Sequence, residues 1–521
     1  MFSNKEELLN NSTNRNDTLL LGIDFGTGGC KLTVINPYGD VVAEVSEEYE
    51  TYHPKPSWCE QNPGDWFLAL TSCLAKIREL KNIDMSQIKS IAMDGSTHNA
   101  VLLDQQMEVI RPTIMWTDQR CIDEVKYLEI GWGAEIFRMT YQKVSPTWTL
   151  PQLLWVKNNE PANFQKIHRI MFVKDYIRYL LTGSWGTDYI DAQGTLLYDV
   201  AKNQWSEELC RLIGLPVEVL PPLCFSTDIV GKISAKAYEF TGLIEGTPVV
   251  CGTSDVTAED YAAGAVKSGQ CIIKLATAGN VNVMTTRPNP NPLTITYSHV
   301  VPDLWYTAAA TNTAAYAMRW FRDNFCFEEI KKSGETGKNA YHLIEDLVQS
   351  IPAGSDGLIF HPYLLGERAP YWDPYLRASF IGVSMSHTKG HFINALMEGV
   401  AFSLKDCFRL IENMNLEISE FIIIGGGSRS DNWSQIICDV FGKKLIRPLV
   451  VDASYGSALL AGVGIGVFAD VVDAVKKCVK VDKIYEPNKL NHQLYQKLFP
   501  VYLAVHNQLK NIYQNIYKII N

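Results

Sequence analysis

The residues best suited to chemistry lie in the stretch 19–34 (LLLGIDFGTGGCKLTV). An apolar run ends at Asp24, a glycine-rich turn with one hydroxyl follows, and a second apolar run completes the stretch. This order is typical of a β-hairpin whose tip carries few side chains, so that its backbone N–H groups can approach an anion. We expect Gly26, Thr27 and Gly28 to face a phosphate, and Asp24 to hold a metal-bound water. The alternative is an ordinary glycine turn.

A partly similar pattern occurs later in the chain. Residues 249–255 (VVCGTSD) again run from an apolar segment into Gly-Thr and an acid, and residues 271–279 (CIIKLATAG) follow. Two similar phosphate-facing halves predict a nucleotide held between two lobes. Asp255 ends the first of these runs, and we expect it to open a helix. A carboxylate there can accept the proton of a substrate hydroxyl as its oxygen attacks phosphorus; the alternative is a helix-capping aspartate.

Another glycine-rich turn follows the apolar run FIII. Gly425, Gly426 and Gly427 form it, and a helix is expected to start near Ser430 or Asp431, either of which can cap it. A flat glycine surface allows a planar base to lie on the backbone, and the N–H groups of a helix start favour phosphate. The alternative is a plain turn between a strand and a helix.

Two polar clusters offer contacts to a hydroxyl-rich compound. Residues 96–99 (STHN) follow an apolar run and include Thr97 and His98, while residues 116–120 (WTDQR) include Asp118. Hydroxyl, imidazole and carboxylate groups suit a polyhydroxy ligand. The alternatives are a structural histidine for His98 and a helix start capped by Asp118.

Composition limits the classes that remain. A chain of 521 residues is long enough for two domains. The formal net charge of −10 argues against a nucleic-acid or anionic-membrane surface. No apolar run approaches the ~20 residues of a membrane span. The 12 cysteines are scattered singly, which predicts reduced thiols in a cytoplasmic protein rather than disulfides or a structural zinc site.

The alternation of strand-like and helical stretches predicts an α/β protein. We expect strands over 19–23, 31–35, 91–93 and 101–103, and helices over 65–80, 150–158 and 174–182. A turn-rich connector over 242–247 predicts an N-terminal lobe over 18–247 and a C-terminal lobe over 248–487. Residues 1–17 are polar and Asn-rich and are expected to form an N-terminal extension, without the apolar core of a secretory signal. Apolar residues at helical intervals predict a closing helical segment over 488–521.

Taken in their order and spacing, these segments resemble the FGGY family of carbohydrate kinases over most of residues 18–515. The resemblance implies two actin/hexokinase-like (ribonuclease H-like) lobes around a central cleft, with ATP, Mg²⁺ and phosphoryl transfer to a sugar or polyol hydroxyl. One family signature region falls at 148–155 (WTLPQLLW), where Gln152 replaces the usual lysine, and the second, over 378–398, fits well.

The resemblance also assigns roles to residues. Asp24 matches the acid on the magnesium side, and Asp255 matches the catalytic base. The ATP-binding positions are Gly26, Thr27, Gly28, Thr277, Gly279, Gly425, Gly426, Gly427, Ser430 and Asn432. The substrate-binding positions are Thr97, His98, Asp118 and Asp255. Gly28 stands where a second hydroxyl is common, and residues 276–279 read ATAG rather than GTSG, so we expect weakened but not abolished ATP binding.

Within the family, the subgroup most similar to this chain is that of the xylulokinases. Residues 95–104 (GSTHNAVLLD) resemble that subgroup's sugar-binding loop, with His98 on its histidine. Glycerol and autoinducer-2 kinases carry Arg-Glu where this chain has Thr97 and His98. Val256, however, replaces a sugar-contacting asparagine, and Ser96 and Thr97 replace Gln and Met.

We therefore expect phosphorylation of a ketopentose such as D-xylulose. L-Xylulose, D-ribulose, erythritol or another polyol stay open as substrates, as does a non-catalytic sugar-sensing role on the same fold. The expected partners are a small-molecule sugar and ATP, with neither nucleic acid nor membrane, and a homodimer is left open.

Overall fold

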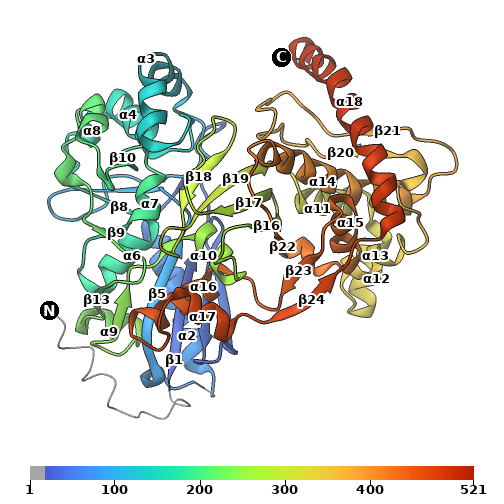
Figure 1. Cartoon of the computed structure of the whole chain (residues 1–521). Helices are drawn as coiled ribbons and strands as arrows, with labels where there is room; N and C mark the ends of the chain where they lie inside the picture. The colour runs from blue at the N-terminus through green and yellow to red at the C-terminus, as the bar shows by residue number, and fades with distance from the viewer. Residues whose placement is uncertain (1–17, 82, 521) are drawn as a thin grey trace. The chain divides into compact units, whose positions relative to one another are not determined.

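The computed structural model describes residues 18–81 and 83–520, so the predicted extension over 1–17 lies outside the described residues. The chain divides into two compact α/β units (Figure 1). Unit 1 takes the described residues up to Val266 together with Tyr297–Asp303 and Val450–Val479. Unit 2 takes Lys267–Thr296, Leu304–Leu449 and the described residues from Lys480 onward. The predicted α/β class is confirmed.

Unit 1 is built on a sheet with the strand order β13-β14-β5-β1-β2-β3. β1 pairs antiparallel with β2, and β2 with β3, whereas β5 runs parallel to β1, β14 and the short strand β15. The strands are β1 (Leu19–Phe25), β2 (Gly29–Ile35), β3 (Val41–Glu48), β5 (Ile88–Gly95), β13 (Ile229–Lys232), β14 (Pro248–Val250) and β15 (Thr253–Ser254).

Both faces of this sheet are covered, which explains why β1 is an unbroken apolar run. Leu21 and Ile23 pack with residues of α2 (Pro63–Glu79), while Leu20 packs with residues of α16 (Ala453–Gly464). A Cβ on Gly22 would lie 1.7 Å from the carbonyl oxygen of Ser454. The glycine is therefore required for α16 to lie this close to β1.

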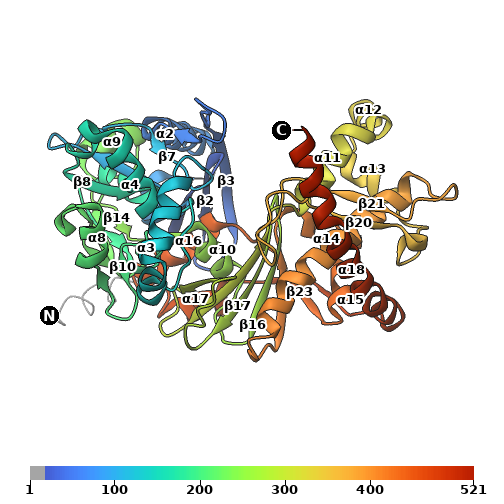
Figure 2. The same cartoon turned by 90° about the horizontal axis from the view of Figure 1, so that it is seen from above.

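Unit 2 repeats the same plan with the strand order β18-β19-β17-β16-β22-β23-β24. β16 and β17 form an antiparallel pair that lies side by side in Figure 2, and β22 runs parallel to β16. The strands are β16 (Gln270–Leu275), β17 (Gly279–Thr285), β18 (Ile295–Ser298), β19 (Trp305–Thr311), β22 (Glu420–Ile424), β23 (Leu445–Pro448) and β24 (Val481–Tyr485). The β16–β17 hairpin is thus the counterpart of the β1–β2 hairpin.

This topology corrects the interpretation of 249–255 as a second phosphate-facing half. These residues belong to unit 1, where β14 and β15 pair with β5 and α10 (Asp255–Ala262) follows. The predicted lobe boundary lies after Thr247, whereas the units divide after Val266, because β14 pairs with β5 in the first sheet. Residues Val450–Val479, predicted within the C-terminal lobe, return to unit 1 because α16 covers its sheet.

The predicted local elements are confirmed in β1, β2, β5, β6 (Ala100–Leu103), α2, α4 (Thr149–Asn159), α6 (Val173–Thr182) and α18 (Lys489–Ile520). The further elements of unit 1 are β4 (Glu60–Gln61), η2 (Met85–Gln87), β6 (Ala100–Leu103), β7 (Thr113–Ile114), α3 (Ile122–Thr140), α4 (Thr149–Asn159), α5 (Pro161–Phe164), β8 (Arg169–Phe172), α6 (Val173–Thr182), β9 (Thr187–Asp188), α7 (Tyr189–Gln193), β10 (Tyr198–Asp199), β11 (Gln204–Trp205), α8 (Glu207–Ile213), η3 (Val217–Val219), β12 (Leu223–Cys224), α9 (Ala235–Thr241) and α17 (Val471–Cys478).

The core of unit 2 forms around α14 (Lys389–Glu412), which is buried along most of its length. The other elements of this unit are α11 (Ala315–Phe325), α12 (Phe327–Thr336), α13 (Ala340–Asp346), η4 (Ser355–Gly357), β20 (Ile359–His361), β21 (Ser379–Ile381), η5 (Gly426–Arg429), α15 (Asp431–Phe441) and α18 (Lys489–Ile520). The second family signature region, 378–398, thus lies on β21 and the first half of α14.

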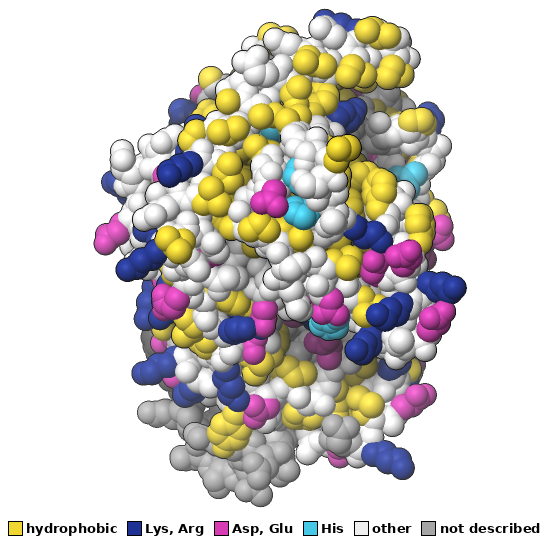
Figure 3. All heavy atoms as spheres, turned by 90° about the vertical axis from the view of Figure 1, so that its right-hand side faces the viewer, with side chains coloured by type: hydrophobic (Ala, Val, Ile, Leu, Met, Phe, Trp, Pro, Cys, Tyr) yellow, Lys and Arg dark blue, Asp and Glu magenta, His cyan; other side chains and the backbone are white. Residues whose placement is uncertain are grey.

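Basic and acidic side chains are interspersed over the face shown in Figure 3. Among the helices of the described ranges, none has the length and apolar character needed to cross a membrane. All twelve cysteines lie in the described part of the chain, and no disulfide joins any of them.

Candidate active site

One edge of the unit 1 sheet gathers several of the predicted groups. The parallel register sets Asp24 of β1 beside Asp94 of β5, and Asp94 beside Thr253 of β15. Parallel strands end at the same edge of a sheet, where α/β proteins commonly bind ligands. Thr97, in the turn after β5, and Asp255, the first residue of α10, follow closely after these strand ends.

Asp255 occupies the first position of α10 and is not its cap. The cap is Ser254, whose hydroxyl oxygen accepts a hydrogen bond from the Thr257 N–H at 3.4 Å. The Asp255 Oδ1 atom accepts one hydrogen bond from the Thr97 hydroxyl at 3.1 Å and one from the Val256 N–H at 2.8 Å. The positive end of the helix dipole favours the ionised carboxylate, which is the form that a general base needs.

The Asp24 carboxylate lies in a concentration of negative charge. Burial raises its pKa to about 8, helped by the nearby charges of Asp452, Asp255 and Glu259, while a hydrogen bond from Asp94 opposes the rise. The Asp24 Oδ1 atom is buried and has no hydrogen-bond partner among the described residues. An orphaned carboxylate oxygen among further acids fits a divalent cation.

The donor set also suggests how such a cation would be held. Within the described ranges, no group of three or more His, Cys, Asp or Glu side chains is arranged to cage a metal ion. Mg²⁺ is commonly bound by one or two carboxylates together with substrate phosphates and water. Asp24 at a strand end beside a glycine turn suits that mode.

The β1–β2 turn places Thr27 in a defined orientation. The Gly26 N–H donates to the Gly29 carbonyl at 3.0 Å, which closes the tip, and the Tyr49 hydroxyl donates to the Gly26 carbonyl. The indole N–H of Trp116 donates to Thr27 Oγ1 at 3.1 Å, so the hydroxyl hydrogen of Thr27 can donate to a phosphate oxygen. Gly28 is exposed, and no atom of the described residues lies within 4 Å of the place of a Cβ.

His98 is a buried, neutral imidazole. Burial lowers its pKa to about 3. Its Nε2 atom lies 3.4 Å from Thr147 Oγ1, its ring packs 4.9 Å from that of Trp148, and its Nδ1 atom has no hydrogen-bond partner among the described residues. A buried nitrogen without a partner is costly unless a ligand supplies one. The geometry therefore supports a polar ligand at His98.

The predicted sugar contact of Asp118 is not supported by the structure. Its buried carboxylate accepts hydrogen bonds from the Cys59 N–H at 2.5 Å and from the Arg120 N–H, Nε and Nη2 at 2.8, 2.9 and 2.7 Å. Both oxygens thus serve to hold Arg120 and the backbone at Cys59. The sugar contact of Asp118 stays a prediction. The capping alternative is wrong, since Cys121 occupies the cap position of α3.

In unit 2, the three glycines at 425–427 differ in their surroundings: two are packed against Leu275 and one is exposed. A Cβ on Gly425, whose φ is +90°, would lie 2.7 Å from the carbonyl carbon of Leu275, and one on Gly427 would lie 2.5 Å from the Cγ of Leu275. These two glycines let the turn after β22 pack on the end of β16. Gly426 is exposed and has nothing within 4 Å of the place of a Cβ, so it offers a bare backbone surface.

The helix after this turn is capped as predicted. Ser430 Oγ accepts a hydrogen bond from the Trp433 N–H at 3.1 Å, and Asn432 in the first turn of α15 is exposed. Ser430 therefore has a structural function besides its predicted ATP contact.

Thr277 and Gly279 lie at the turn between β16 and β17. The Thr277 side chain is exposed, and its carbonyl accepts from the Ala314 N–H at 2.9 Å. A Cβ on Gly279 would lie 2.8 Å from a methyl carbon of Leu404. The turn therefore presents a hydroxyl from a position fixed by packing, as the Thr27 turn does in unit 1.

Some residues of this region were missed by sequence reasoning. Asp94 lies beside Asp24 and accepts from the Ser457 hydroxyl at 2.6 Å. Its signal was available, because it is an acid at a strand end just before Thr97. Asp188 and Asp191, which pair with the buried Lys174, were missed because no spacing in the sequence indicates them.

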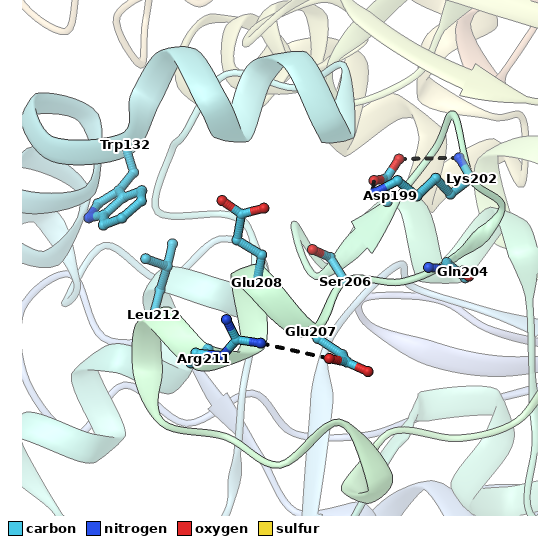
Figure 4. A pocket seen from close by; sticks show the side chains of 9 residues that line it. All are labelled: Trp132, Asp199, Lys202, Gln204, Ser206, Glu207, Glu208, Arg211 and Leu212. Atoms are coloured by element: carbon cyan, nitrogen blue, oxygen red, sulfur yellow. Dashed lines mark hydrogen bonds and ion pairs between the residues drawn. The ribbon is translucent and has the colours of Figure 1, made fainter.

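A hollow of about 600 Å³ on unit 1 is lined by other residues (Figure 4). Asp199 pairs with Lys202 at 3.1 Å, and Glu207 with Arg211 at 3.7 Å. The remaining lining residues are Trp132, Gln204, Ser206, Glu208 and Leu212. None of them is a predicted site residue, and the charged groups largely pair with one another.

The chain matches the models of one known protein family over most of its length. Residues 19–260 match the N-terminal domain, and residues 272–465 the C-terminal domain, of the FGGY family of carbohydrate kinases. The chain belongs to the FGGY family of carbohydrate kinases. It is accordingly an ATP-dependent carbohydrate kinase, a phosphotransferase that acts on an alcohol group.

Relatives of this FGGY kinase cover nearly the whole chain. The xylulose kinase of Bacillus subtilis is 32% identical over 496 residues, which are 95% of this chain and 97% of that protein. The gluconokinase of the same organism is 30% identical over 504 residues, 95% of this chain and 97% of that protein. A solved structure, that of a xyloylose kinase from Brucella ovis, has a TM-score of 0.84 and 28% identity, covering 95% of this chain and 100% of the other.

Proposed function

We propose that this FGGY kinase transfers the γ-phosphoryl group of ATP to a hydroxyl of a ketopentose, with D-xylulose as the foremost substrate. The observation that carries the proposal is the neutral, buried His98, whose Nδ1 atom has no hydrogen-bond partner among the described residues. The neighbouring Thr97 donates a hydrogen bond to Asp255. A neutral imidazole can both donate to and accept from sugar hydroxyls. Relatives named xylulose kinase at about 30% identity support the same substrate class.

The residues of unit 1 divide the chemistry between them. Asp255 accepts the proton of the attacking hydroxyl, while Thr97 fixes the orientation of its carboxylate. Asp24 would hold Mg²⁺, whose chemistry when bound is to neutralise charge on the phosphates. Thr27 would donate to a phosphate oxygen from the β1–β2 turn.

The residues of unit 2 are proposed to bind the nucleotide. The exposed backbone at Gly426 would carry the adenosine, with Asn432 in the first turn of the neighbouring helix. Thr277 at the β16–β17 turn would contact the phosphates. These assignments rest on the resemblance and on the exposed positions of the residues.

Gluconate is the second candidate, because a gluconokinase is 30% identical to this chain. Burial keeps His98 uncharged, so its imidazole offers no positive charge to the carboxylate of gluconate. The neutral imidazole therefore favours an uncharged sugar.

An assay of ADP release tests this proposal. D-Xylulose, L-xylulose, D-ribulose, D-gluconate, erythritol and glycerol are compared on wild type, on His98→Ala and on the control His342→Ala, which alters an exposed histidine of unit 2. We expect the highest kcat/KM for D-xylulose and a loss of about ten- to a hundredfold in His98→Ala, with an unchanged KM for ATP. A preference for gluconate or glycerol would reject the ketopentose, and no sugar-dependent release at all would favour a sugar-sensing protein.

We further propose that the enzyme works in the cytoplasm, with the sugar and ATP as its small-molecule partners. Eleven of the twelve cysteines are buried, which fits a reducing compartment, where thiols persist without disulfides. Fractionation of cells that produce the tagged protein tests this location.

A further inference from the structure

A cluster of buried charges is hydrogen-bonded to the backbone of His98 and to Thr253, two residues before Asp255. The Lys174 ammonium is 2.7 Å from Asp191, 3.0 Å from Asp188 and 3.0 Å from Asp175, and these four side chains are almost wholly inaccessible. Burial opposes the charge of Lys174, yet the three aspartates raise its pKa well above the usual range. Breaking such a buried network leaves uncompensated charge, so its geometry is held firmly.

Asp191 connects the cluster to His98. Its Oδ1 atom accepts a hydrogen bond from the His98 backbone N–H at 3.2 Å, and the Thr149 hydroxyl donates to the His98 carbonyl at 2.7 Å. His98 has a φ of +54°, in the left-handed region that is uncommon for residues other than glycine. A backbone conformation of this kind persists only where neighbouring groups hold it.

Asp188 connects the cluster to the strand that leads to Asp255. Its Oδ2 atom accepts from the Thr253 hydroxyl at 3.0 Å and from the Ser226 hydroxyl at 3.2 Å. Thr253 lies in β15, two residues before Asp255. Asp188 also caps α7, the short helix that carries Asp191. The two aspartates are therefore fixed relative to each other by local structure as well as by Lys174.

We infer that Lys174, through Asp191 and Asp188, is a positioning residue that sets the place of the sugar-facing His98 relative to the catalytic Asp255. This inference rests on the proposed function, since it assumes those roles for His98 and Asp255. Lys174 itself touches neither the sugar nor the reacting atoms; it acts through the two aspartates. The cluster thus has two arms, one from Asp191 to His98 and one from Asp188 through Thr253 to Asp255. The first arm holds a binding residue and should affect the KM for the sugar, whereas the second holds the base and should affect kcat.

Asp191→Asn and Asp188→Asn separate these arms. We expect Asp191→Asn to raise the KM for D-xylulose by about tenfold with a small change in kcat, and Asp188→Asn to lower kcat by about tenfold. The KM for ATP should stay unchanged in both. The matched control is Asp175→Asn, because Asp175 pairs with Lys174 and Arg178 rather than with either turn. It removes a charge from the same buried cluster and should leave both parameters near wild type.

A second pair of variants keeps every charge in place. Thr253→Val and Ser226→Ala each remove one hydroxyl donor to Asp188, but only Thr253 lies in the strand before Asp255. We expect kcat to fall by about three- to tenfold in Thr253→Val and to hold in Ser226→Ala. If the three aspartate variants do not fold, this pair still tests whether Asp188 positions Asp255 through Thr253.

Equal kinetic effects of Asp175→Asn, Asp188→Asn and Asp191→Asn, or of Thr253→Val and Ser226→Ala, would overturn the inference, because a merely structural cluster has no preferred arm. Failure of the proposed function gives a different result. His98→Ala and Asp255→Asn would then keep near wild-type kinetics, whatever the cluster variants do.

Discussion

The Thr97 hydroxyl donates to Asp255 across 3.1 Å and so joins the turn after β5 to the first residue of α10. These residues are far apart in the sequence, but their elements meet because β15 runs parallel to β5 and ends beside it. A hydrogen bond to a carboxylate is worth about 1.5–3 kcal/mol. It fixes the direction in which the carboxylate can receive a proton.

Thr97→Val should therefore lower kcat by about tenfold or more, since Asp255 loses the donor that orients it. Thr97→Ser keeps the hydroxyl and is the matched control. Steady-state kinetics with D-xylulose at saturating ATP make the comparison. A Thr97→Ser variant as slow as Thr97→Val would show that the methyl group, and not the hydrogen bond, matters.

Asp24→Asn should raise the Mg²⁺ and ATP concentrations needed for half-maximal rate, while sugar affinity measured without nucleotide stays unchanged. The reason is that the substitution removes one negative oxygen from the cation's proposed ligands. Calorimetry with D-xylulose alone and with ATP–Mg²⁺ separates the two effects. Loss of sugar binding with intact nucleotide binding would reverse the assignment.

Gly425→Ala should lower the free energy of unfolding and raise the KM for ATP, because its Cβ would meet the backbone of Leu275 at 2.7 Å. Gly426→Ala meets nothing within 4 Å and should leave the free energy of unfolding within about 0.5–1 kcal/mol of wild type. It should still raise the KM for ATP if adenosine lies on this backbone. Thermal unfolding and ATP titrations measure both. Equal stability losses in the two variants would contradict the packing argument.

The buried His98 predicts a specific dependence of stability on pH. Its pKa is 6.5 in the unfolded chain and about 3 in the folded chain. Between these values the unfolded chain binds a proton that the folded chain does not, so stability falls as pH falls. For each pH unit by which the pH falls across this window, the free energy of unfolding of wild type should decrease by about 1.4 kcal/mol more than that of His98→Asn. Above pH 6.5 the difference between the two proteins should be constant. Urea unfolding at a series of pH values checks this, and a constant difference throughout would contradict it.

The sequence predicted those parts of the site that depend on local patterns. Apolar runs followed by glycine and an acid correctly indicated β1, β22 and the helix start at Asp255. The assignment of 249–255 to a second phosphate-facing half was wrong. A strand that leads into a hairpin turn and a strand that leads into a helix can both be followed by Gly-Thr and an acid. Only the pairing of β14 and β15 with β5 distinguishes them.

Asp118 and the Lys174 cluster show that contacts formed only in the folded chain could not be predicted from the sequence. The carboxylate of Asp118 is occupied by Arg120, which lies only two residues away, yet its direction depends on how the loop folds back over Trp58. Lys174 meets Asp188 and Asp191 because α6 and α7 come together in the folded unit. Side-chain direction and tertiary contacts of this kind leave no regular spacing in the sequence.

The most direct test of the account is the rate of phosphoryl transfer in Asp255→Asn at saturating D-xylulose and ATP. The account predicts that kcat falls by at least ~10², the lower range for loss of general-base help, while ATP binding and the temperature of unfolding stay close to those of wild type. A variant that folds, binds both substrates and turns over near the wild-type rate would contradict the role of Asp255 on which the proposed mechanism depends.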